Sequence, residues 1–200
     1  ERIVEQCIKE TWPEFYCSVS STILPEFREF ERLSTTVINS YLGPRMKMYI
    51  HHLQDRIRQV GVRVEPYITQ SNGGVMSISS TIQTPVQTAL SGPSAGVMGA
   101  VYVAKAAGFL DIITYDMGGT STDVSLVKDG IAEYTTKRKV CGLPSGVPMI
   151  DVHAVGAGGG SIAHIDNAGA LKVGPESAGA NPGPVAYNLG NEQPVVTDAN

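Results

Sequence analysis

An acidic residue, two glycines and a run of hydroxyl side chains follow an apolar stretch in the segment TYDMGGTSTDVSLV. Because glycine has no side chain, the backbone N–H groups of Gly118, Gly119 and Thr120 are unshielded, and N–H groups that point the same way form a nest for an anion. The hydroxyls of Thr120 and Ser121 can add donors, and Asp116 can hold Mg²⁺ directly or through water. The segment therefore predicts a phosphate-binding loop with its own metal anchor.

The same segment has a simpler interpretation as a turn between two strands. Gly-Gly between two β-like runs is a common hairpin signal. We favour phosphate binding because an acid precedes the glycines, Thr-Ser-Thr-Asp follows them, and a stretch of small residues typical of a closely packed helix lies upstream. A Walker loop is excluded, since that motif needs a GKS or GKT ending with a helix directly after it.

A second glycine cluster, GAGGGS at residues 156–161, follows another apolar stretch. Its spacing departs from GxGxxG, and the SIAHID that comes next has the pattern of a strand, so a Rossmann dinucleotide site is disfavoured. Two interpretations stay open for this cluster. Either Gly158, Gly159 and Gly160 contact the cofactor, or they form a turn that lets two strands pack closely.

Two pairs of aspartate and histidine lie near this second cluster. Asp151 and His153 are two positions apart on an expected strand, and therefore on the same face. Since histidine titrates near neutrality and a carboxylate can orient it, the pair could act as acid and base or hold a further divalent metal. No third ligand is evident, so a histidine hydrogen-bonded in place is the alternative. His164 and Asp166 repeat the spacing on an expected hairpin, where we expect both to face solvent.

Helices are expected to dominate the first part of the chain. Apolar residues at helical spacing in RIVEQCIKETW predict a helix that Pro13 ends, and the FYCSVS that follows has a β-like pattern. Residues 24–61 alternate charged and apolar side chains at helical period. Pro25 suits a first helical turn, whereas Gly43–Pro44 is expected to break the run and Gly61 to end it, which predicts a helical hairpin.

Strands and glycine turns are expected after the helical part. VRVEPYITQSNGG has the pattern of a strand that runs into a turn, and this SNGG turn is either a plain turn or a place where backbone approaches a substrate or phosphate. SISSTIQTPVQTALSG predicts a short capped helix, and SGPSAGVMGAVYVAKAAG predicts a helix of small residues closed by Gly108. The strand DIITYD, the first glycine loop and another strand follow, with turns expected at Asp129–Gly130 and Asn167–Gly169. Little regular structure is expected in the tail, ESAGANPGPVAYNLGNEQPVVTDAN.

Composition narrows the class of protein. The 200 residues include 42% apolar side chains, which is ample material for a packed core. Lys and Arg number 15 against 19 Asp and Glu, a formal charge of -4, so the chain lacks the positive surplus that binding a nucleic-acid backbone requires. No apolar run is long enough to cross a membrane, and the start lacks the pattern of a signal peptide. Cys7, Cys17 and Cys141 fit neither a disulfide framework nor a metal knuckle, so we expect buried or half-buried free thiols and a cytoplasmic location.

Several ordered blocks of the sequence carry a resemblance to a known family. A resemblance to the connecting helix and second phosphate-binding loop of the actin, Hsp70 and sugar-kinase ATPase superfamily rests on GPSAGVMGAVYVAKAAG followed by IITYDMGGTSTDVSLV. A narrower resemblance, to the hydantoinase A and 5-oxoprolinase family, extends from about Ser18 to Asn200 and rests on ILPEFREFERLSTTVINSYLGP, TQSNGGVMS, SGPSAGVMGA, DMGGTSTDV, VGAGGGSIA and VGPESAGANPGP. It implies an α/β, actin-like ATPase fold of the ribonuclease H-like kind, present in part, with a mixed sheet flanked by helices.

The resemblance also implies an activity. The family's enzymes use ATP and Mg²⁺ to open a cyclic amide such as a hydantoin or 5-oxoproline, with the ring amide activated by phosphorylation, and a second, B-type subunit or domain takes part. The run from Asp116 to Thr120 matches the second phosphate loop, and Ser91–Gly99 matches the start of the connecting helix. We take the acids on either side of the loop, Asp116 and Asp123, as catalytic candidates.

Two other functions stay open at this point. Ketone carboxylases that act on acetone or acetophenone are similar to the same subunit. An ATP-gated module of the chaperone or filament type, which converts no metabolite, is the second alternative.

One departure from the family pattern concerns length. The family's full subunit is much longer and begins with another phosphate loop of the D-x-GGT type, whereas this chain has one such loop. The adenosine-binding stretch has no secure place here either. We therefore expect residues 1–90 to form the end of a first ATPase lobe, and residues 91–200 the connecting helix and the core of a second. By itself this segment is expected to bind nucleotide poorly and to be inactive.

Overall fold

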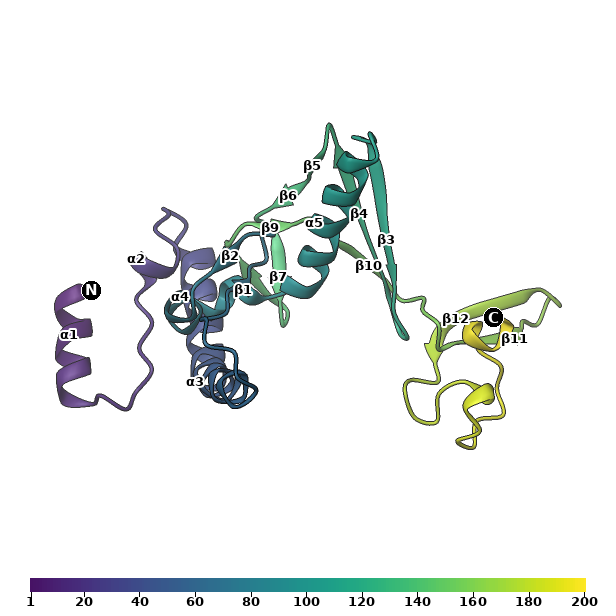
Figure 1. Cartoon of the computed structure of the whole chain (residues 1–200), viewed down its shortest axis with the longest axis horizontal. Helices are drawn as coiled ribbons and strands as arrows, with labels where there is room; N and C mark the ends of the chain where they lie inside the picture. The colour runs from purple at the N-terminus through teal and green to yellow at the C-terminus, as the bar shows by residue number, and fades with distance from the viewer. The chain divides into compact units, whose positions relative to one another are not determined.

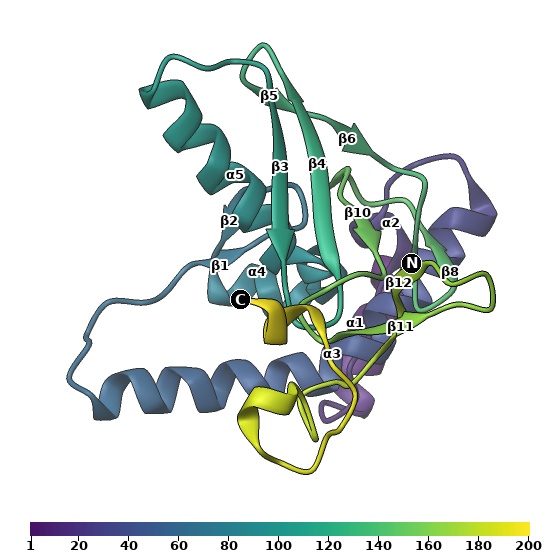
Figure 2. The ribbon, with the colours of Figure 1, turned by 90° about the vertical axis from the view of Figure 1, so that its right-hand side faces the viewer.

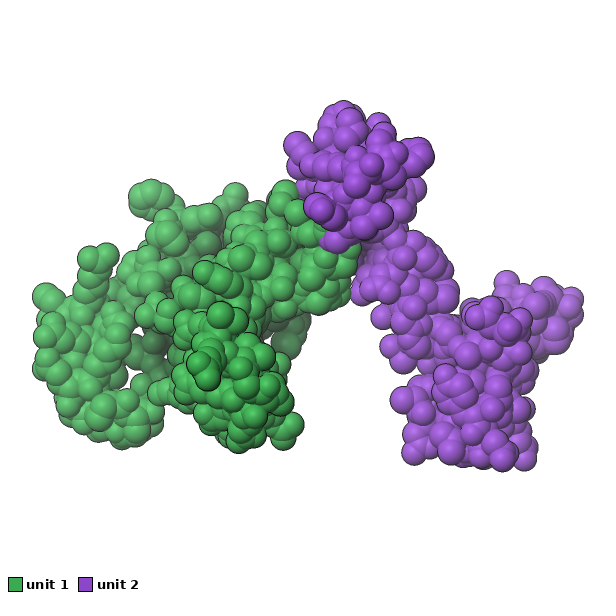
Figure 3. Space-filling model, in the orientation of Figure 1, with its two compact units in different colours: residues 1–98, 134–150 green, residues 99–133, 151–200 purple.

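The computed structural model describes all 200 residues, and they divide into two compact units (Figure 3). Each unit is built from two stretches of chain: Glu1–Met98 with Tyr134–Ile150 in unit 1, and Gly99–Glu133 with Asp151–Asn200 in unit 2. The chain thus passes from unit 1 to unit 2 inside the helix of small residues and later returns to unit 1. The assignment of residues 1–90 and 91–200 to two ATPase lobes stays a prediction.

Unit 1 is largely helical and carries three short antiparallel strand pairs, β1 with β2, β6 with β9, and β7 with β8 (Figure 1). Its helical elements are α1 (Arg2–Thr11), α2 (Ser20–Ile23), α3 (Glu29–Gln59), α4 (Ile78–Gln83), the 3-10 turn η1 (Pro85–Thr88) and the first part of α5 (Ser91–Ala106). Its strands are β1 (Ile68–Thr69), β2 (Val75–Met76), β6 (Tyr134–Thr135), β7 (Arg138–Val140), β8 (Leu143–Ser145) and β9 (Met149–Ile150). No helix of the chain combines the length and apolar character that a membrane crossing requires. The cysteines of this unit are free thiols, but Cys7 and Cys141 are exposed and only Cys17 is half-buried, so the expected burial is wrong for two of them.

The longest helix, α3, contradicts the predicted helical hairpin. It runs unbroken over 31 residues, with Pro44 inside it. A proline in a helix costs about 3 kcal/mol, because it removes an N–H donor and crowds the carbonyl one turn earlier. The burial of Ile38 and Ile50 on either side of Pro44 offsets that cost. Gly43 is buried, and a Cβ there would clash with the Tyr16 ring, so this glycine permits close packing and does not break the helix.

The core of unit 1 fixes α3 to the segments around it. Its central cluster consists of the buried side chains Ile23, Ile38, Val86, Val147 and Met149. Asn39, also buried, donates from Nδ2 to Ser18 Oγ (3.0 Å) and to the Gln83 carbonyl (3.1 Å). Ser18 belongs to the FYCSVS run, which forms no strand, so the β prediction there is wrong. Its side chains bond to helices rather than to another strand, as Tyr16 does through the Ile82 carbonyl (2.7 Å).

Unit 2 contains both glycine clusters and a small antiparallel sheet (Figures 1 and 2). The strand order is β10–β4–β3, with β5 paired to one end of β4, and a separate hairpin joins β11 to β12. The elements are the rest of α5, β3 (Ile112–Met117), β4 (Thr122–Lys128), β5 (Ile131–Ala132), β10 (His153–Val155), β11 (Ser161–Ile165), β12 (Leu171–Ser177), and the 3-10 turns η2 (Val185–Tyr187) and η3 (Val196–Ala199). All strand pairs are antiparallel, so the mixed character expected of the sheet does not appear within these residues.

Turn chemistry read from the sequence is confirmed at several places. Asp129 and Gly130 have φ of 52° and 72° and connect β4 to β5, as left-handed residues do in a tight hairpin. Gly108 follows the end of α5 with φ of 84°, and Ser77 caps α4 by accepting a backbone N–H. The turn predicted at Asn167–Gly169 joins β11 to β12, and the tail after β12 carries the two 3-10 turns and one isolated antiparallel bridge, from Val195 to Ile162.

Candidate functional site

Strands β3 and β4 place the two predicted catalytic acids opposite each other. Asp116 pairs with Asp123 in the antiparallel register, so both side chains project to the same face of the sheet. Neither carboxylate has a hydrogen bond or ion pair within the chain, and like charges directly opposite each other destabilise a strand pair. A bound divalent cation would relieve this repulsion, which agrees with the role predicted for Asp116.

The loop between these strands, residues 118–121, leaves two of its amides without a partner. The Gly118 N–H donates to the Ser121 carbonyl (2.8 Å), so it is not one of the unshielded donors expected from the sequence. The amides of Gly119 and Thr120 form no hydrogen bond in the chain, and neither do the Thr120 and Ser121 hydroxyls. A Cβ added at Gly119 would meet nothing within 4 Å. The segment is therefore a hairpin turn and also a loop with exposed donors.

The GAGGGS cluster, residues 156–161, forms a second loop that packs through its backbone against the first loop, residues 118–121. The Gly159 N–H donates to the Gly118 carbonyl (2.9 Å), and the Gly160 N–H donates to the Gly119 carbonyl (2.6 Å). A Cβ added at Gly158 would lie 2.7 Å from backbone atoms of the first loop, so only glycine permits this approach. These contacts support the close-packing interpretation of the cluster.

The docking also sets the direction of the two unpartnered amides. In a trans peptide the carbonyl oxygen and the N–H of the next residue point in opposite directions, and no peptide bond in either loop is cis. Because the Gly118 carbonyl points toward Gly159, the Gly119 N–H points away from the second loop. In the same way, the bond from Gly160 to the Gly119 carbonyl turns the Thr120 N–H outward. Contact with the second loop thus directs the Gly119 and Thr120 N–H groups of the first loop outward.

The amides of the second loop are themselves used inside the chain. Besides the two bonds to the first loop, the Gly158 N–H donates to Ser161 Oγ (2.9 Å). Thr122 Oγ1 donates to the Ala157 carbonyl (2.5 Å), which ties the start of β4 to the same loop. The contact of Gly158, Gly159 and Gly160 with a cofactor stays a prediction, and their N–H groups are not available to make it.

Thr197, a residue of the tail, holds the second loop in place, a role that was not predicted from the sequence. The N–H and the Oγ1 of Thr197 both donate to the Gly159 carbonyl, each at 2.8 Å. Thr197 lies in η3, within the VVTDAN that ends the tail. Threonine followed by aspartate is a common source of side-chain bonds to nearby backbone, so the pair signalled a turn. Nothing in the local pattern signalled the partner at Gly159.

Asp198 stabilises the conformation of the tail in which Thr197 reaches the Gly159 carbonyl. Its carboxylate accepts the backbone N–H groups of Ala186 (2.8 Å), Val195 (2.8 Å) and Val185 (3.1 Å). These bonds stabilise the charged form, and with the bond from Ala186 contributing most they hold the pKa of Asp198 below its usual range. The carboxylate therefore joins η2 to η3.

The first loop faces an open depression of about 650 Å³ in unit 2. The loops contribute Met117, Gly118, Gly119 and Gly159 to its lining, and the tail contributes Tyr187, Val196, Thr197, Ala199 and Asn200. The glycine loop is thus not folded back against its own sheet. A phosphate group could reach it from the depression.

The predicted Asp151 and His153 pair is formed, but without a third ligand. Asp151 Oδ2 lies 3.4 Å from His153 Nε2 at the start of β10. No three His, Cys, Asp or Glu side chains gather anywhere in the chain, so a metal at this pair stays a prediction that rests on two residues. His164 is exposed as expected, whereas Asp166 is part-buried and accepts two backbone N–H groups in its hairpin turn (2.9 Å each).

Unit 1 has hollows of its own, and one of them involves the SNGG turn. A hollow of about 410 Å³ is lined by Asn72, Gly73, Gly74, Met98, Tyr134 and Pro148. Gly73 has φ of 78°, and a Cβ there would lie 2.5 Å from Met98 Cγ, so the turn itself requires glycine. The plain-turn interpretation therefore accounts for this glycine without a ligand.

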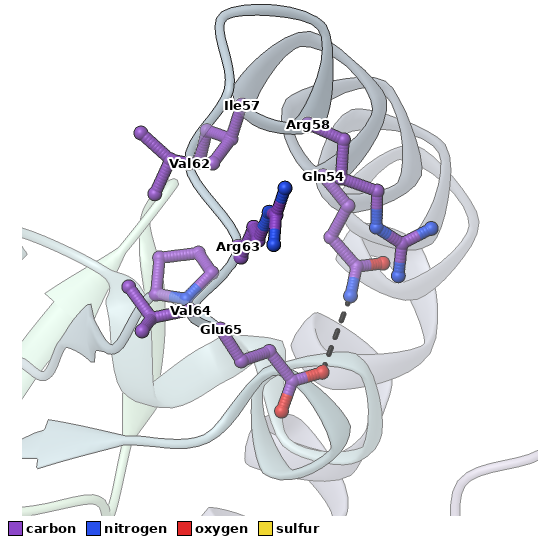
Figure 4. A pocket seen from close by; sticks show the side chains of 8 residues that line it. Gln54, Ile57, Arg58, Val62, Arg63, Val64 and Glu65 are labelled. Atoms are coloured by element: carbon purple, nitrogen blue, oxygen red, sulfur yellow. Dashed lines mark hydrogen bonds between the residues drawn. The ribbon is translucent and has the colours of Figure 1, made fainter.

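A second hollow in unit 1, of about 210 Å³, lies at the end of α3 (Figure 4). Figure 4 shows Arg63 directed into it, with Gln54 bonded to Glu65 (3.3 Å) on one side. None of its residues belongs to a site predicted from the sequence. The chemistry of interest therefore remains at the glycine loops of unit 2.

Known proteins are similar to this chain in sequence and in fold. The family model described as Hydantoinase/oxoprolinase matches residues 32–200. The alpha subunit of caprolactamase from Pseudomonas jessenii is 41% identical over 193 residues, covering 96% of this chain and 28% of that protein. The crystal structure of ATP-dependent caprolactamase from Pseudomonas jessenii matches with a TM-score of 0.83 at 40% identity, covering 100% of this chain and 29% of that one. A nucleotide-free structure of acetone carboxylase matches with a TM-score of 0.69 at 27% identity, covering 98% and 28%.

These similarities confirm the fold class and the resemblance found in the sequence. The chain spans less than a third of the length of the proteins it matches. The blocks from Ser18 onward and the match over residues 32–200 point to the same group of enzymes. The chain therefore belongs to the hydantoinase/oxoprolinase family.

Proposed function

We propose that this chain carries the phosphate-binding loop of an enzyme that uses ATP to open a cyclic amide of the hydantoin or 5-oxoproline type. One observation carries the proposal: the unpartnered amides of Gly119 and Thr120 follow a strand that ends in an opposed pair of acids, beside an open depression. Unshielded N–H groups suit phosphate oxygens, and carboxylates suit the Mg²⁺ that accompanies them. The residues present therefore fit a magnesium-bound nucleotide.

Each group at the loop has its own part in this proposal. The amides of Gly119 and Thr120, with the Ser121 hydroxyl, bind phosphate oxygens. Asp116 and Asp123 hold the metal. When bound, ATP with Mg²⁺ supplies the phosphoryl group that activates the ring amide. Phosphoryl transfer depends on positioned donors and on the metal's charge more than on a covalent nucleophile, which suits a site of backbone, hydroxyl and carboxylate groups.

The substrate class is supported by the family rather than by the pocket. Hydantoins, 5-oxoproline and caprolactam are all cyclic amides, so the family and the caprolactamase relative share one kind of bond to be opened. Because that relative is a subunit of a larger enzyme and this chain covers 28% of it, we propose that further chain and a second subunit or domain complete the active site.

The likeness to acetone carboxylase favours a second candidate function. In that function the same loop binds ATP, but the activated species leads to carboxylation of a ketone. A chaperone-like or filament-like module has no such support, because the relatives reported above are enzymes of small molecules.

An assay of the intact protein separates these functions. Phosphate release from ATP is measured against a hydantoin, 5-oxoproline and caprolactam, and separately against a ketone with bicarbonate. Release that depends on a cyclic amide supports the proposal, whereas release that needs both ketone and bicarbonate supports the carboxylase. Release that ignores all small molecules and responds to an unfolded polypeptide would favour the ATP-gated module. Absence of ATP hydrolysis under every condition contradicts all three.

A further inference from the structure

A series of hydrogen bonds links the tail to the exposed donors of the first loop. Thr197 donates twice to the Gly159 carbonyl, at 2.8 Å from both N and Oγ1. Gly159 then donates to the Gly118 carbonyl at 2.9 Å. The opposite end of that same peptide is the unpartnered Gly119 N–H. Two segments far along the chain, the tail and the second loop, therefore act on one peptide group of the first loop.

Thr197 acts on both bonds between the two loops. A peptide carbonyl that accepts hydrogen bonds polarises its own peptide group, and the peptide of the Gly159 carbonyl carries the Gly160 N–H, so the two bonds from Thr197 strengthen the bond from Gly160 to the Gly119 carbonyl (2.6 Å). The two donors of Thr197 also restrain the position of Gly159, which has no side chain to hold it. Without them the bond to the Gly118 carbonyl would have more room to lengthen, and the Gly119 N–H would lose its fixed direction.

We propose that Thr197 is a positioning residue of the nucleotide site, acting through Gly159 and Gly160 on the Gly119 and Thr120 amides. This inference rests on the proposed function, since it assigns Thr197 to the same phosphate loop. Thr197 also lines the depression that the loop faces, so its side chain stands beside the path of the ligand. A role limited to anchoring the tail would affect stability alone.

Three substitutions of threonine test the role in the intact protein. Thr197→Val keeps the volume and the backbone N–H but removes the Oγ1 donor, and Thr197→Ser keeps the donor. Thr88→Val is the matched control, because Thr88 also lies in a 3-10 turn and donates to a carbonyl (2.7 Å), but in unit 1. The readouts are equilibrium affinity for a non-hydrolysable ATP analogue with Mg²⁺, KM and kcat for ATP, and the thermal midpoint.

We expect Thr197→Val to weaken the affinity and raise KM by about 5-fold, with kcat within about 2-fold, as for loss of one supporting hydrogen bond. Thr197→Ser and Thr88→Val should bind the analogue like the unmodified protein. If Thr197→Val lowers the thermal midpoint but leaves the affinity unchanged, Thr197 only anchors the tail and the inference is overturned. If the unmodified protein binds no ATP analogue, the proposed function fails first and the inference with it.

A second pair of variants decides the matter should Thr197→Val fail to fold. A Cβ added at Gly159 would lie 2.6 Å from Thr197 Oγ1, with its next neighbours at 3.8 and 4.0 Å. Gly159→Ala should therefore displace Thr197 and weaken the analogue's binding, and adding Thr197→Ala should remove the clash. The double variant is expected to bind no worse than Thr197→Ala alone. Full affinity in Gly159→Ala would overturn the inference.

Discussion

The two glycine clusters of unit 2 are alike in composition and opposite in the use of their backbones. At Gly119 and Thr120 in the first cluster the N–H groups have no partner, and a Cβ added at Gly119 would enter open space. In the second cluster all of the N–H groups from Gly158 to Gly160 donate within the chain, and added Cβ atoms at both ends of that run would strike backbone. Glycine thus appears once to expose amides and once to permit contact.

This difference separates two kinds of damage. A side chain added to the first cluster meets the ligand's space, so it should harm binding and spare the fold. A side chain added at Gly158 or Gly160 in the second meets the first loop, so it should harm both binding and the fold. The substitutions below test the contrast, beginning with the largest expected effect.

Asp116→Asn should have the largest effect on activity. It keeps the shape of the side chain but removes one of the two carboxylates proposed to hold Mg²⁺. We expect turnover of ATP to fall by about 10³-fold. The thermal midpoint should stay unchanged or rise slightly, since the opposed like charges are removed. Phosphate release over a range of Mg²⁺ concentrations, with thermal unfolding in parallel, measures both.

The control for this variant is Asp129→Asn. It removes the same charge in the turn that follows β4, where φ of 52° suits asparagine as well as aspartate. Turnover in Asp129→Asn should remain within about 2-fold of the unmodified protein. Retention of full ATP turnover by Asp116→Asn would remove the metal site from the proposal.

Gly158→Ala should have the next largest effect, and on both properties. Its Cβ would lie 2.7 Å from Gly119 C and from Thr120 N, and no side-chain rotation can relieve a clash with backbone. The first loop must shift, so we expect a loss of about 10²-fold in affinity for the ATP analogue and a lower thermal midpoint. Gly156→Ala is the control, because its Cβ would meet nothing within 4 Å. Equal behaviour of the two variants would break the contrast between the clusters.

Gly119→Ala and Gly160→Ala should have smaller effects, the first mainly on analogue affinity and the second on the thermal midpoint. The Cβ at Gly119 enters open space, so the thermal midpoint should hold while analogue affinity falls by about 10-fold through crowding of the phosphate. The Cβ at Gly160 would lie 2.9 Å from the Gly119 carbonyl oxygen, so the thermal midpoint should fall. A stable Gly160→Ala together with an unstable Gly119→Ala would reverse our assignment.

Local chemistry explains which parts of the fold could be predicted from the sequence. Asp129–Gly130 and Gly108 adopt backbone angles that few other residues tolerate, so each of these turns can be predicted from its residue types alone. The break predicted at Gly43–Pro44 is wrong. The pair normally ends a helix, but here the packing of Tyr16 against Gly43 outweighs that tendency. Helical period predicted helix over most of α3, but α3 begins at Glu29 and not in the turn of Pro25, and the period could not weigh tertiary contacts against a proline.

The candidate site divides in the same way. The acid, the glycines and the hydroxyls of the first loop were found from their order alone. Which amides stay unpartnered depends on Ser121, Gly159 and Gly160, and two of these come from a segment far along the chain. The partnership of Thr197 with Gly159 likewise joins two loops that no periodic pattern connects.

The smallest effect we expect concerns Asp198, which joins the two 3-10 turns of the tail. Its pKa is lowered in the folded protein from an ordinary value of 3.8, chiefly by the N–H bond from Ala186. The folded state therefore binds this proton less readily than the unfolded chain does, and the resulting stabilisation is fully present above that ordinary value. It is lost as the pH falls below 3.8 through the lowered pKa of the folded state.

Asp198→Asn should remove this dependence, because an amide does not titrate. Thermal midpoints of both proteins, measured from about pH 6 to about pH 3, should lie apart at the upper end and converge at the lower end. Since Asp198 is only part-buried and water still reaches its carboxylate, the separation should be small, and the slopes must be compared rather than single points. The unmodified protein should also lose analogue affinity over the same low range if the tail positions the phosphate loop through Thr197. Parallel curves for the two proteins would mean that the tail's carboxylate contributes nothing to the assembly of loops, and the contrast between the clusters would then rest on the glycines alone.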